Sequence, residues 1–467
     1  MEHPKPVRPG EVCRLRIEDL AHEGEGVGRC AGLAVFIPLA LPGDLAEVQI
    51  QEVRRHYARG RLLRLVEPSP ERVKPPCPSW PRCGGCQLPH LDYRAQLDRK
   101  RRLVEAALRR LGHLEEVPVR ETLGMDEPWF YRNKAQFPVR GRPGHLEMGF
   151  FARGTHQVVP IDQCRIHHPL ISRTLQVVKP LLEEYRVPPY DEESGRGLLR
   201  HVAVRVGFRT GEVLLTFVTA ASSFPPGPEV AERLRAALPE VVGVAQNVNP
   251  RRTNVIFGPE TFLLAGRGYI LEELCGVRFR ISPTSFFQVN PRQAEVLYAR
   301  VARYAGLAEE REAGGANPVP EAPTLLDLYS GIGSIALCLA GRAGRVIGVE
   351  EAEEAVRDAR ENARLNGIAN AEFRCGPVEE VLPRLAAEGL RPDIAVLDPP
   401  RSGCSPQVLD TVAELAAPRL VYVSCHPATL ARDLARLRQR GYQAVEVQPV
   451  DMFPQTSHVE AVALCCL

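Results

Sequence analysis

Alternation of apolar and polar positions is the clearest feature of the first 66 residues. Apolar runs at 11–20, 33–41, 45–53 and 60–66 are separated by turns that contain glycine. This spacing predicts about five short strands that close into a small barrel. Small barrels of this type often bind RNA. We therefore expect an RNA-binding β-barrel over residues 1–66.

A proline-rich stretch follows the barrel, and the pattern beyond it differs. Residues 91–112 show helical spacing of leucine and valine with a basic opposite face. From about 128 onward, short β-rich runs such as HVAVRVGF and EVLLTFVT are frequent, and long helical patterns are few. We assign residues 67–280 to a β-rich central domain.

The pattern changes again near residue 324, where strands begin to alternate with helices. Such alternation predicts a parallel sheet that is covered by helices on both faces. We assign residues 281–467 to this α/β domain. The stretch at 309–323 lacks periodicity and is predicted to be a mobile loop.

The segment DLYSGIGS places Gly331 and Gly333 between an apolar strand and a helix. Glycines there let a ligand approach the backbone closely. Glu350 ends the next strand, where a carboxylate can accept hydrogen bonds from two ribose hydroxyls. Gly331, Gly333 and Ala336 also fit the dinucleotide fingerprint. The motif therefore predicts a nucleotide cofactor, either S-adenosyl-L-methionine (AdoMet) or NAD.

Two later motifs supply reactive side chains. LDPPRSGC and VYVSCHPATLARDL close the fourth and fifth strands of this domain, so Asp398 and Cys425 should face the crevice at the carboxyl ends of the strands. Cys425 also precedes a helix, whose N-terminal dipole should lower the thiol pKa. A lone cysteine at a strand end is otherwise more often a small buried apolar residue.

Cys425 suits one particular reaction. C5 of a pyrimidine is a poor nucleophile until a thiolate adds at C6, after which C5 can accept a methyl group. A base must then remove the C5 proton so that elimination frees the cysteine. Glu460 in the final strand is the candidate base, with His458 two residues before it on the same strand face.

A cysteine cluster follows the barrel. CPSWPRCGGC has a C-x5-C-x2-C spacing, and a fourth cysteine lies in IDQCRIHH. The candidate metal ligands are Cys77, Cys83, Cys86 and Cys164. Zinc and a [4Fe–4S] cluster both accept four thiolates. A fourth protein ligand argues against a radical AdoMet enzyme, whose cluster needs one open iron. Three histidines are alternative ligands: His90, His167 and His168.

Charge and cysteine content narrow the class of protein. The chain has 59 Lys and Arg against 57 Asp and Glu, but residues 53–110 contain 15 basic and 5 acidic residues. That bias suits a surface that faces phosphates. Thirteen cysteines without a signal peptide indicate free or ligated thiols in the reducing cytoplasm. No apolar run approaches the ~20 residues that span a membrane. We expect a cytoplasmic monomer with RNA as its partner.

Taken together, the motifs resemble the bacterial RNA 5-methyluridine methyltransferases of the RumA and TrmA type over essentially the whole chain. SFFQVN, DLYSGIG, VIGVE, LDPPRSGC, VYVSCHPATLARD and DMFPQTSHVE follow one another in the family's order. The resemblance implies a TRAM-type (OB-like) barrel, a β-rich central domain and a Rossmann-like class I AdoMet-dependent methyltransferase domain. It further implies AdoMet contacts by Gln288, Tyr329, Glu350 and Asp398, a nucleophile at Cys425 and a base at Glu460.

The cysteine cluster resembles the [4Fe–4S] site of the ribosomal RNA members, so the resemblance implies methylation of uracil C5, with 23S ribosomal RNA as substrate. Alternatives are a transfer RNA 5-methyluridine enzyme, an RNA cytosine-C5 methyltransferase and a non-enzymatic RNA-binding assembly factor. Two positions depart from the family pattern. His426 stands where members usually have Asn, and Ser330 stands where they usually have Cys.

Overall fold

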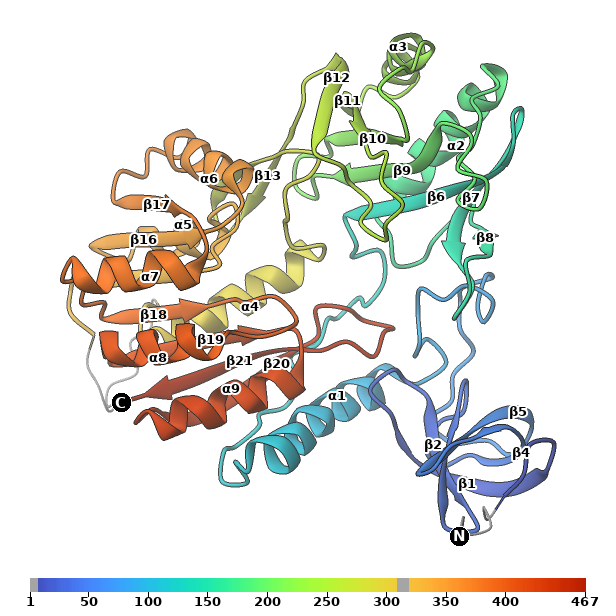
Figure 1. Cartoon of the computed structure of the whole chain (residues 1–467), viewed down its shortest axis with the longest axis horizontal. Helices are drawn as coiled ribbons and strands as arrows, with labels where there is room; N and C mark the ends of the chain where they lie inside the picture. The colour runs from blue at the N-terminus through green and yellow to red at the C-terminus, as the bar shows by residue number, and fades with distance from the viewer. Residues whose placement is uncertain (1–6, 309–318) are drawn as a thin grey trace.

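The computed structural model describes residues 7–308 and 319–467. Figure 1 shows a small barrel at the N-terminus, a central sheet and a larger C-terminal sheet, arranged around an open middle. Most of the loop predicted over 309–323 lies outside the described residues. No helix within 7–308 or 319–467 has both the length and the apolar character needed to cross a membrane.

The N-terminal barrel confirms the predicted five strands. They close in the order β1-β2-β3-β5-β4. Their bounds are β1 (Val12–Leu20), β2 (Gly26–Cys30), β3 (Leu33–Ile37), β4 (Leu45–Val53) and β5 (Tyr57–Glu67). Alternate residues of β1 are buried, as expected for a strand with one face on a core. A disulfide joins Cys13 to Cys30 across β1 and β2. The other eleven cysteines are free thiols, in line with the expectation that most would be.

A seven-stranded sheet forms the central unit and confirms the β-rich prediction. Its order is β12-β11-β10-β9-β6-β7-β8, and only β10 and β11 pair in parallel. The strands are β6 (Lys134–Arg142), β7 (His145–Phe151), β8 (Val158–Pro160), β9 (Leu199–Val206), β10 (Val213–Thr219), β11 (Val241–Val248) and β12 (Glu260–Gly266). Helices α2 (Pro169–Glu184) and α3 (Gly227–Ala237) pack against each other and share one apolar core with the sheet.

The C-terminal sheet has the order β17-β16-β15-β18-β19-β21-β20, parallel except for β21, which runs antiparallel to both of its neighbours. Its strands are β15 (Thr324–Leu328), β16 (Arg345–Glu350), β17 (Ala371–Cys375), β18 (Ile394–Leu397), β19 (Arg419–Ser424), β20 (Gln443–Val450) and β21 (Glu460–Cys466). The chain reverses its direction of winding between β15 and β18. Ligands bind at such a switch point, beyond the carboxyl ends of the strands.

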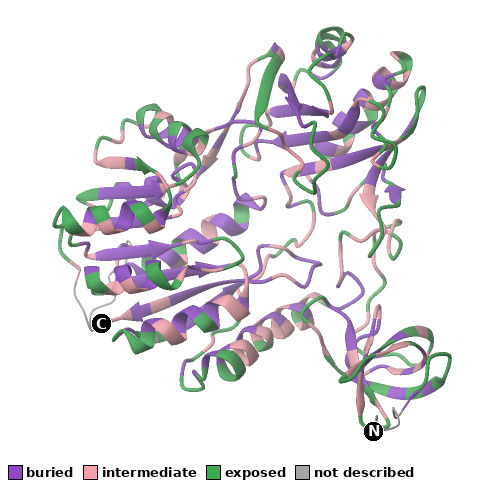
Figure 2. Cartoon of the chain, in the orientation of Figure 1, coloured by how far each residue is buried: buried purple, intermediate pink, exposed green. Residues whose placement is uncertain are grey.

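Helices cover both faces of this sheet, which confirms the predicted α/β class. Helices α4 (Pro291–Tyr304), α5 (Ser334–Ala340) and α6 (Glu353–Leu365) share one core with the sheet. The opposite face packs against α7 (Val378–Ala387), α8 (Pro406–Leu415) and α9 (Pro427–Gln439). The central strands are therefore buried along nearly their whole length (Figure 2). This burial explains their continuous apolar sequences.

Two segments of the predicted central domain pack on the C-terminal unit instead. Helix α1 (Tyr93–Ala107) continues into the π-helical turn η1 (Leu108–Gly112), and both contribute to the core under α9. The buried ammonium of Lys100 lies 2.5 Å from a carboxylate oxygen of Asp451. The hairpin of β13 (Ile270–Leu274) and β14 (Val277–Ile281) joins the core beside α5. Segments assigned to the central domain (67–280) from the sequence therefore pack in the core of the C-terminal domain.

Candidate active site

The carboxyl ends of the C-terminal strands open onto a cavity of about 1280 Å³. The loops after β15, β16, β18 and β19 line it, together with the SFFQVN segment and the start of β21. All six residues predicted to bind the cofactor or to act in catalysis line this cavity: Gln288, Tyr329, Glu350, Asp398, Cys425 and Glu460. The structure therefore brings together residues that lie far apart in the sequence.

The glycine loop has the backbone geometry that its sequence predicts. Tyr329, Gly331 and Gly333 all have left-handed backbone conformations, with φ of 64°, 55° and 80°. A Cβ atom at Gly333 would lie 2.8 Å from the ring of Phe373, so this position needs glycine for space as well as for conformation. The same added atom at Gly331 would meet no heavy atom within 4 Å.

Glu350 fixes the loop to the next strand. One carboxylate oxygen accepts from the backbone N–H of Gly331 at 3.0 Å, and the other accepts from that of Ala352 at 2.9 Å. Each oxygen keeps a further lone pair for a hydroxyl donor. The carboxylate is therefore positioned to accept hydrogen bonds from a ribose, so the residues present fit AdoMet.

Gln288 reaches the cavity from the segment that joins the central sheet to the C-terminal sheet. The side-chain amide of Asn133 donates to the Gln288 carbonyl at 3.1 Å, and the Asn133 backbone N–H donates to Val289 at 2.8 Å. Asn290 donates to the carbonyl of Met452 at 3.1 Å. The central sheet therefore sets the position of this wall of the cavity.

Cys425 and Glu460 face each other across two paired strands. In the antiparallel ladder of β19 and β21, Ser424 pairs with Ala461, so continuing the register places Cys425 opposite Glu460. Directly opposed residues point to the same face of a sheet, with Cβ atoms about 5 Å apart. His458 also lines the cavity, but it lies in the loop before β21 and not on the strand as expected.

Burial controls the acidity of the two carboxyl groups. Burial raises the pKa of Asp398 to about 7. Burial, and then the charge of Asp398, raise the pKa of Glu460 to about 8. The Oε2 atom of Glu460 has no hydrogen-bond partner among the described residues. Glu460 is therefore a strong base once it has lost its proton.

The thiol of Cys425 behaves differently from the prediction. Burial, followed by the charges of Glu460 and Asp398, raises its pKa, and Arg401 only partly opposes this rise. The expectation that helix α9 would lower the thiol pKa is therefore wrong. The helix starts beside the thiol, but its N-cap is His426, whose ring nitrogen accepts from the Thr429 N–H at 3.4 Å.

The four predicted metal ligands lie close together. Burial, and then the charges of the other three cysteine thiols, raise the pKa of Cys86, so all four groups are within electrostatic range. The backbone N–H of Gly85 donates to the sulfur of Cys83 at 3.4 Å. Even so, no group of three or more His, Cys, Asp or Glu side chains in 7–308 or 319–467 is arranged to hold a metal ion. The structure therefore does not support the predicted metal site.

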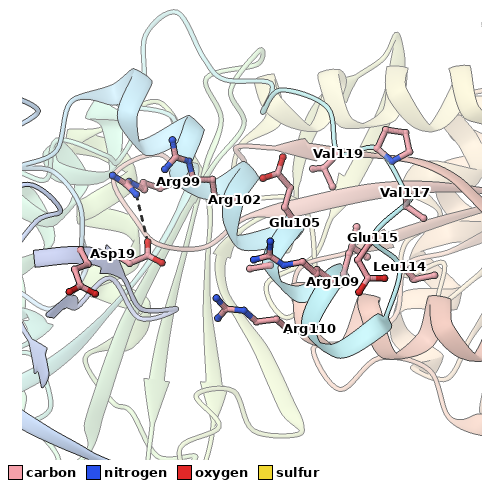
Figure 3. A pocket seen from close by; sticks show the side chains of 14 residues that line it. Asp19, Arg99, Arg102, Glu105, Arg109, Arg110, Leu114, Glu115, Val117 and Val119 are labelled. Carbon is pink, nitrogen blue, oxygen red and sulfur yellow. Dashed lines mark ion pairs between the residues drawn. The ribbon is translucent and has the colours of Figure 1, made fainter. Parts of the chain in front are cut away.

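A second groove lies beside the barrel. It has a volume of about 620 Å³ and is lined by the end of β1, by α1 and η1, and by the segment that follows them. Figure 3 shows the guanidinium groups of Arg109 and Arg110 over this groove, and the ion pair that joins Arg99 to Asp19. Neither Arg109 nor Arg110 makes a side-chain hydrogen bond or ion pair to another described residue.

Sequence reasoning missed two residues that line the active-site cavity. The Phe286 side chain is 69% exposed although it is large and apolar, and the guanidinium of Arg401 has no partner among the described residues. Both lie inside motifs that were recognised, SFFQVN and LDPPRSGC. The motifs gave the location of these residues, but not their exposure.

The doubly wound sheet, with its cofactor loop at the switch point and a thiol at the end of a neighbouring strand, defines a class I AdoMet-dependent methyltransferase. The comparisons with known proteins agree with this class. Residues 6–63 match the TRAM domain, and residues 319–465 match the family described as tRNA (Uracil-5-)-methyltransferase.

Relatives of nearly equal length refine the assignment. An uncharacterized RNA methyltransferase of Halalkalibacterium halodurans is 46% identical over 98% of both chains, and one of Caldanaerobacter subterraneus is 42% identical over 98% of both. The solved Pyrococcus abyssi tRNA (uracil-54, C5)-methyltransferase, in complex with S-adenosyl-L-homocysteine, has a TM-score of 0.75 and 28% identity over 97% of this chain and 99% of its own. This chain belongs to the RNA uracil-C5 methyltransferase family, and it is an AdoMet-dependent RNA methyltransferase.

Proposed function

We propose that the protein methylates C5 of a uracil in RNA and that Cys425 is the covalent nucleophile. The observation that carries the proposal is the register of β19 and β21, which sets Cys425 opposite Glu460 inside the cavity that the cofactor loop also lines. The nucleophile attacks C6 of the uracil and the general base removes the proton from the neighbouring C5. The two side chains must therefore lie this close together.

The steps follow from these positions. The thiolate of Cys425 forms a bond to C6, and the electron pair released at C5 makes that carbon nucleophilic. AdoMet, when bound, would supply the methyl group to C5 and leave as S-adenosyl-L-homocysteine when its sulfur–methyl bond breaks. Glu460 then removes the remaining C5 proton, and the C6–sulfur bond breaks to regenerate the thiolate. The high pKa of Glu460 favours this transfer, because the carboxylate must pull a proton from carbon.

We further propose 23S ribosomal RNA as the substrate, on the resemblance of the cysteine cluster to that of the ribosomal RNA members. Transfer RNA is the second candidate, because the solved neighbour methylates uracil-54 of tRNA and the matching family is described for tRNA. With either substrate, 23S ribosomal RNA or transfer RNA, the enzyme would act on RNA in the cytoplasm.

One experiment separates these functions. Ribosomal RNA and tRNA from a strain that lacks the gene are incubated with the enzyme and labelled AdoMet, and the modified nucleosides are identified by mass spectrometry. We expect 5-methyluridine at a site in 23S ribosomal RNA. Label in tRNA alone would assign the second substrate, 5-methylcytidine would show a cytosine enzyme, and the absence of label would favour an assembly factor.

We also propose that Cys77, Cys83, Cys86 and Cys164 hold a [4Fe–4S] cluster. Four thiolates around one zinc ion crowd to within about 4 Å of one another, given Zn–S bonds of about 2.3 Å. Each cysteine of a cluster binds a different iron, which requires a wider set of thiols. The four cysteines are half-buried and within electrostatic range of one another, and the backbone N–H of Gly85 donates to the Cys83 sulfur, as it would to a thiolate ligand. The cluster would stabilise the loops between the barrel and the central sheet.

The basic stretch at 53–110 supplies the proposed RNA contacts, although fewer of them than its charge suggests. Nine of its fifteen basic side chains have an acidic or amide partner within the protein. Six are exposed and make no side-chain hydrogen bond or ion pair to another described residue: Arg55, Lys74, Arg82, Arg94, Arg109 and Arg110. These six are the candidates for phosphate contacts, because forming such contacts breaks no internal ion pair.

A further inference from the structure

One contact joins the barrel to the nucleophile's own loop. The ring of His22, in the turn between β1 and β2, lies 5.2 Å from the ring of His426, centroid to centroid, with an interplanar angle of 72°. His426 directly follows Cys425 and caps helix α9. The barrel therefore brings the exposed His22 side chain to the edge of the catalytic site.

The turn that carries His22 is held in place from several directions. Gly24 packs so closely that an added Cβ would lie 2.9 Å from Gln87 and 3.5 Å from Ser457. The guanidinium of Arg153 donates to the carbonyl of Glu23 at 3.2 Å. Three other segments of the protein therefore fix the position of His22.

Four side chains that can carry positive charge meet here from four different segments. Arg401 follows β18, His426 follows β19, His458 precedes β21 and His22 comes from the barrel. Burial, then His22 and Arg401, lower the pKa of His426. Burial, then Arg401 and His22, lower the pKa of His458 to about 4, with smaller contributions from Lys100 and Arg132. Positive charge on Arg401 and His22 thus disfavours protonation of His426 and His458.

Acidic groups near this cluster neutralise it only in part. Burial raises the pKa of Glu460 to about 8 and that of Asp398 to about 7, so near neutral pH these two carboxyl groups carry less negative charge than exposed ones would. Glu23 shares the turn with His22 and is exposed. The guanidinium of Arg401 and the ring of His22 make no side-chain hydrogen bond or ion pair to another described residue. The side chains of His22 and Arg401 therefore remain available to a ligand at this edge of the cavity.

We propose that His22, His426, His458 and Arg401 bind a backbone phosphate of the RNA strand next to the uridine in the cavity. The proposal rests on the proposed function, in which a base must leave its stack to reach Cys425. The sugar–phosphate backbone of that nucleotide then lies at the cavity mouth. A phosphate favours protonated imidazoles, so binding raises the histidine pKa values and takes up protons.

This cluster makes RNA affinity fall as pH rises, whereas the reactivity of the Cys425 thiol increases as pH rises. As pH rises, the histidines lose their protons and the phosphate contact weakens, whereas Cys425 becomes the reactive thiolate. We therefore assign part of the substrate affinity of this chain to His22 and His426.

The test measures RNA KM and kcat from pH 6 to 8.5 for the wild type, His22→Ala and His426→Asn, with His56→Ala as the control. His56 is exposed on the same barrel and makes no contact with the cluster. We expect RNA KM to rise about threefold to tenfold at pH 6 in the first two variants and to change little at pH 8.5, with the effect on KM rather than on kcat. His22→Arg should keep tight binding at pH 8.5.

A second measurement identifies the ligand as a phosphate. Direct RNA binding is compared for an RNA hairpin and for the same hairpin with neutral methylphosphonate linkages on both sides of the uridine. The neutral linkages should abolish the pH dependence in the wild type and weaken binding less in His22→Ala than in the wild type. A pH dependence of RNA affinity that is equal in the wild type and both variants would overturn the proposal. Because binding needs no turnover, failure of the proposed methylation would be seen separately, as absent product.

Discussion

At the scale of single residues, the chemistry depends on one thiol. Replacing Cys425 by Ala should lower turnover by roughly 10⁴-fold or more, because the thiol that would form the bond to C6 is lost. AdoMet affinity should survive, since Glu350 and the glycine loop are untouched. Turnover and cofactor binding are measured together, with Cys375→Ala as the control on an exposed thiol. Appreciable turnover in the Cys425 variant would exclude covalent catalysis.

Glu460 has a different expected phenotype. Glu460→Gln cannot accept the C5 proton, so the methylated base should remain bonded to Cys425 and turnover should fall by roughly 10²–10⁴-fold. A denaturing gel after reaction with labelled RNA should show a protein–RNA adduct that is absent for Cys425→Ala. If neither an adduct nor a loss of rate is found, another group is the base.

The buried carboxyl of Glu460 also links stability to pH. Its pKa rises from 4.5 to about 8 on folding. Between these values the folded state holds a proton that the unfolded chain has released, so the free energy of unfolding falls as pH rises, by up to about 1.4 kcal/mol per pH unit. Glu460→Gln should therefore match the wild type in Tm at pH 5 and exceed it at pH 8. A Tm difference independent of pH would show that the carboxyl titrates normally.

These residues illustrate what a sequence can predict at this scale. Motif order predicted that Cys425, Glu460 and Asp398 would share one cavity, as they do, because strand ends of a parallel sheet meet at one edge. The sign of the shift in the Cys425 pKa was wrong, because the helix dipole was weighed without Glu460, which lies opposite only after β21 pairs with β19. A pKa shift depends on the distances between charged groups in the folded protein, and the sequence alone does not give these distances.

At the scale of elements, the periodicity of the sequence predicted most strands and helices correctly. It did not predict which elements pack against each other. The helical pattern at 91–112 became α1 and η1, but nothing local indicated that its apolar face would cover the C-terminal sheet. Likewise, the hairpin of β13 and β14 alternates like an ordinary strand pair and yet completes the core beside α5. An apolar face predicts that it will be buried, but not against which partner.

The predicted metal ligands Cys77, Cys83, Cys86 and Cys164 give a prediction at this scale. If it holds a [4Fe–4S] cluster, protein purified without oxygen should be brown and contain about four iron atoms per chain. Cys164→Ser should lose most of the iron, because Cys164 comes from a separate segment, whereas Cys375→Ser should retain it. Metal analysis that finds one zinc and no iron would refute the cluster.

At the scale of the whole molecule, the barrel, the central sheet and the C-terminal sheet form three distinct units (Figure 1). The charge count along the chain overstated the RNA surface, since ion pairs such as Arg64 with Glu47 satisfy many of the arginines internally. Arg109 and Arg110 are different, because they lie over the groove between the barrel and η1 and pair with no side chain in the described part of the chain (Figure 3). An RNA strand that leaves the catalytic cavity and follows this side of the protein would meet them.

The double variant Arg109→Ala/Arg110→Ala tests this path. Each lost phosphate contact should flatten the slope of log affinity against log salt by about 0.7–0.9, so two contacts should change it by about 1.5. RNA KM should rise at low salt and converge with the wild type at high salt, while AdoMet affinity stays constant because its loop lies in the C-terminal sheet. Arg64→Ala is the matched control, since that arginine is exposed but paired. An unchanged slope in the double variant would show that RNA leaves the enzyme by another surface.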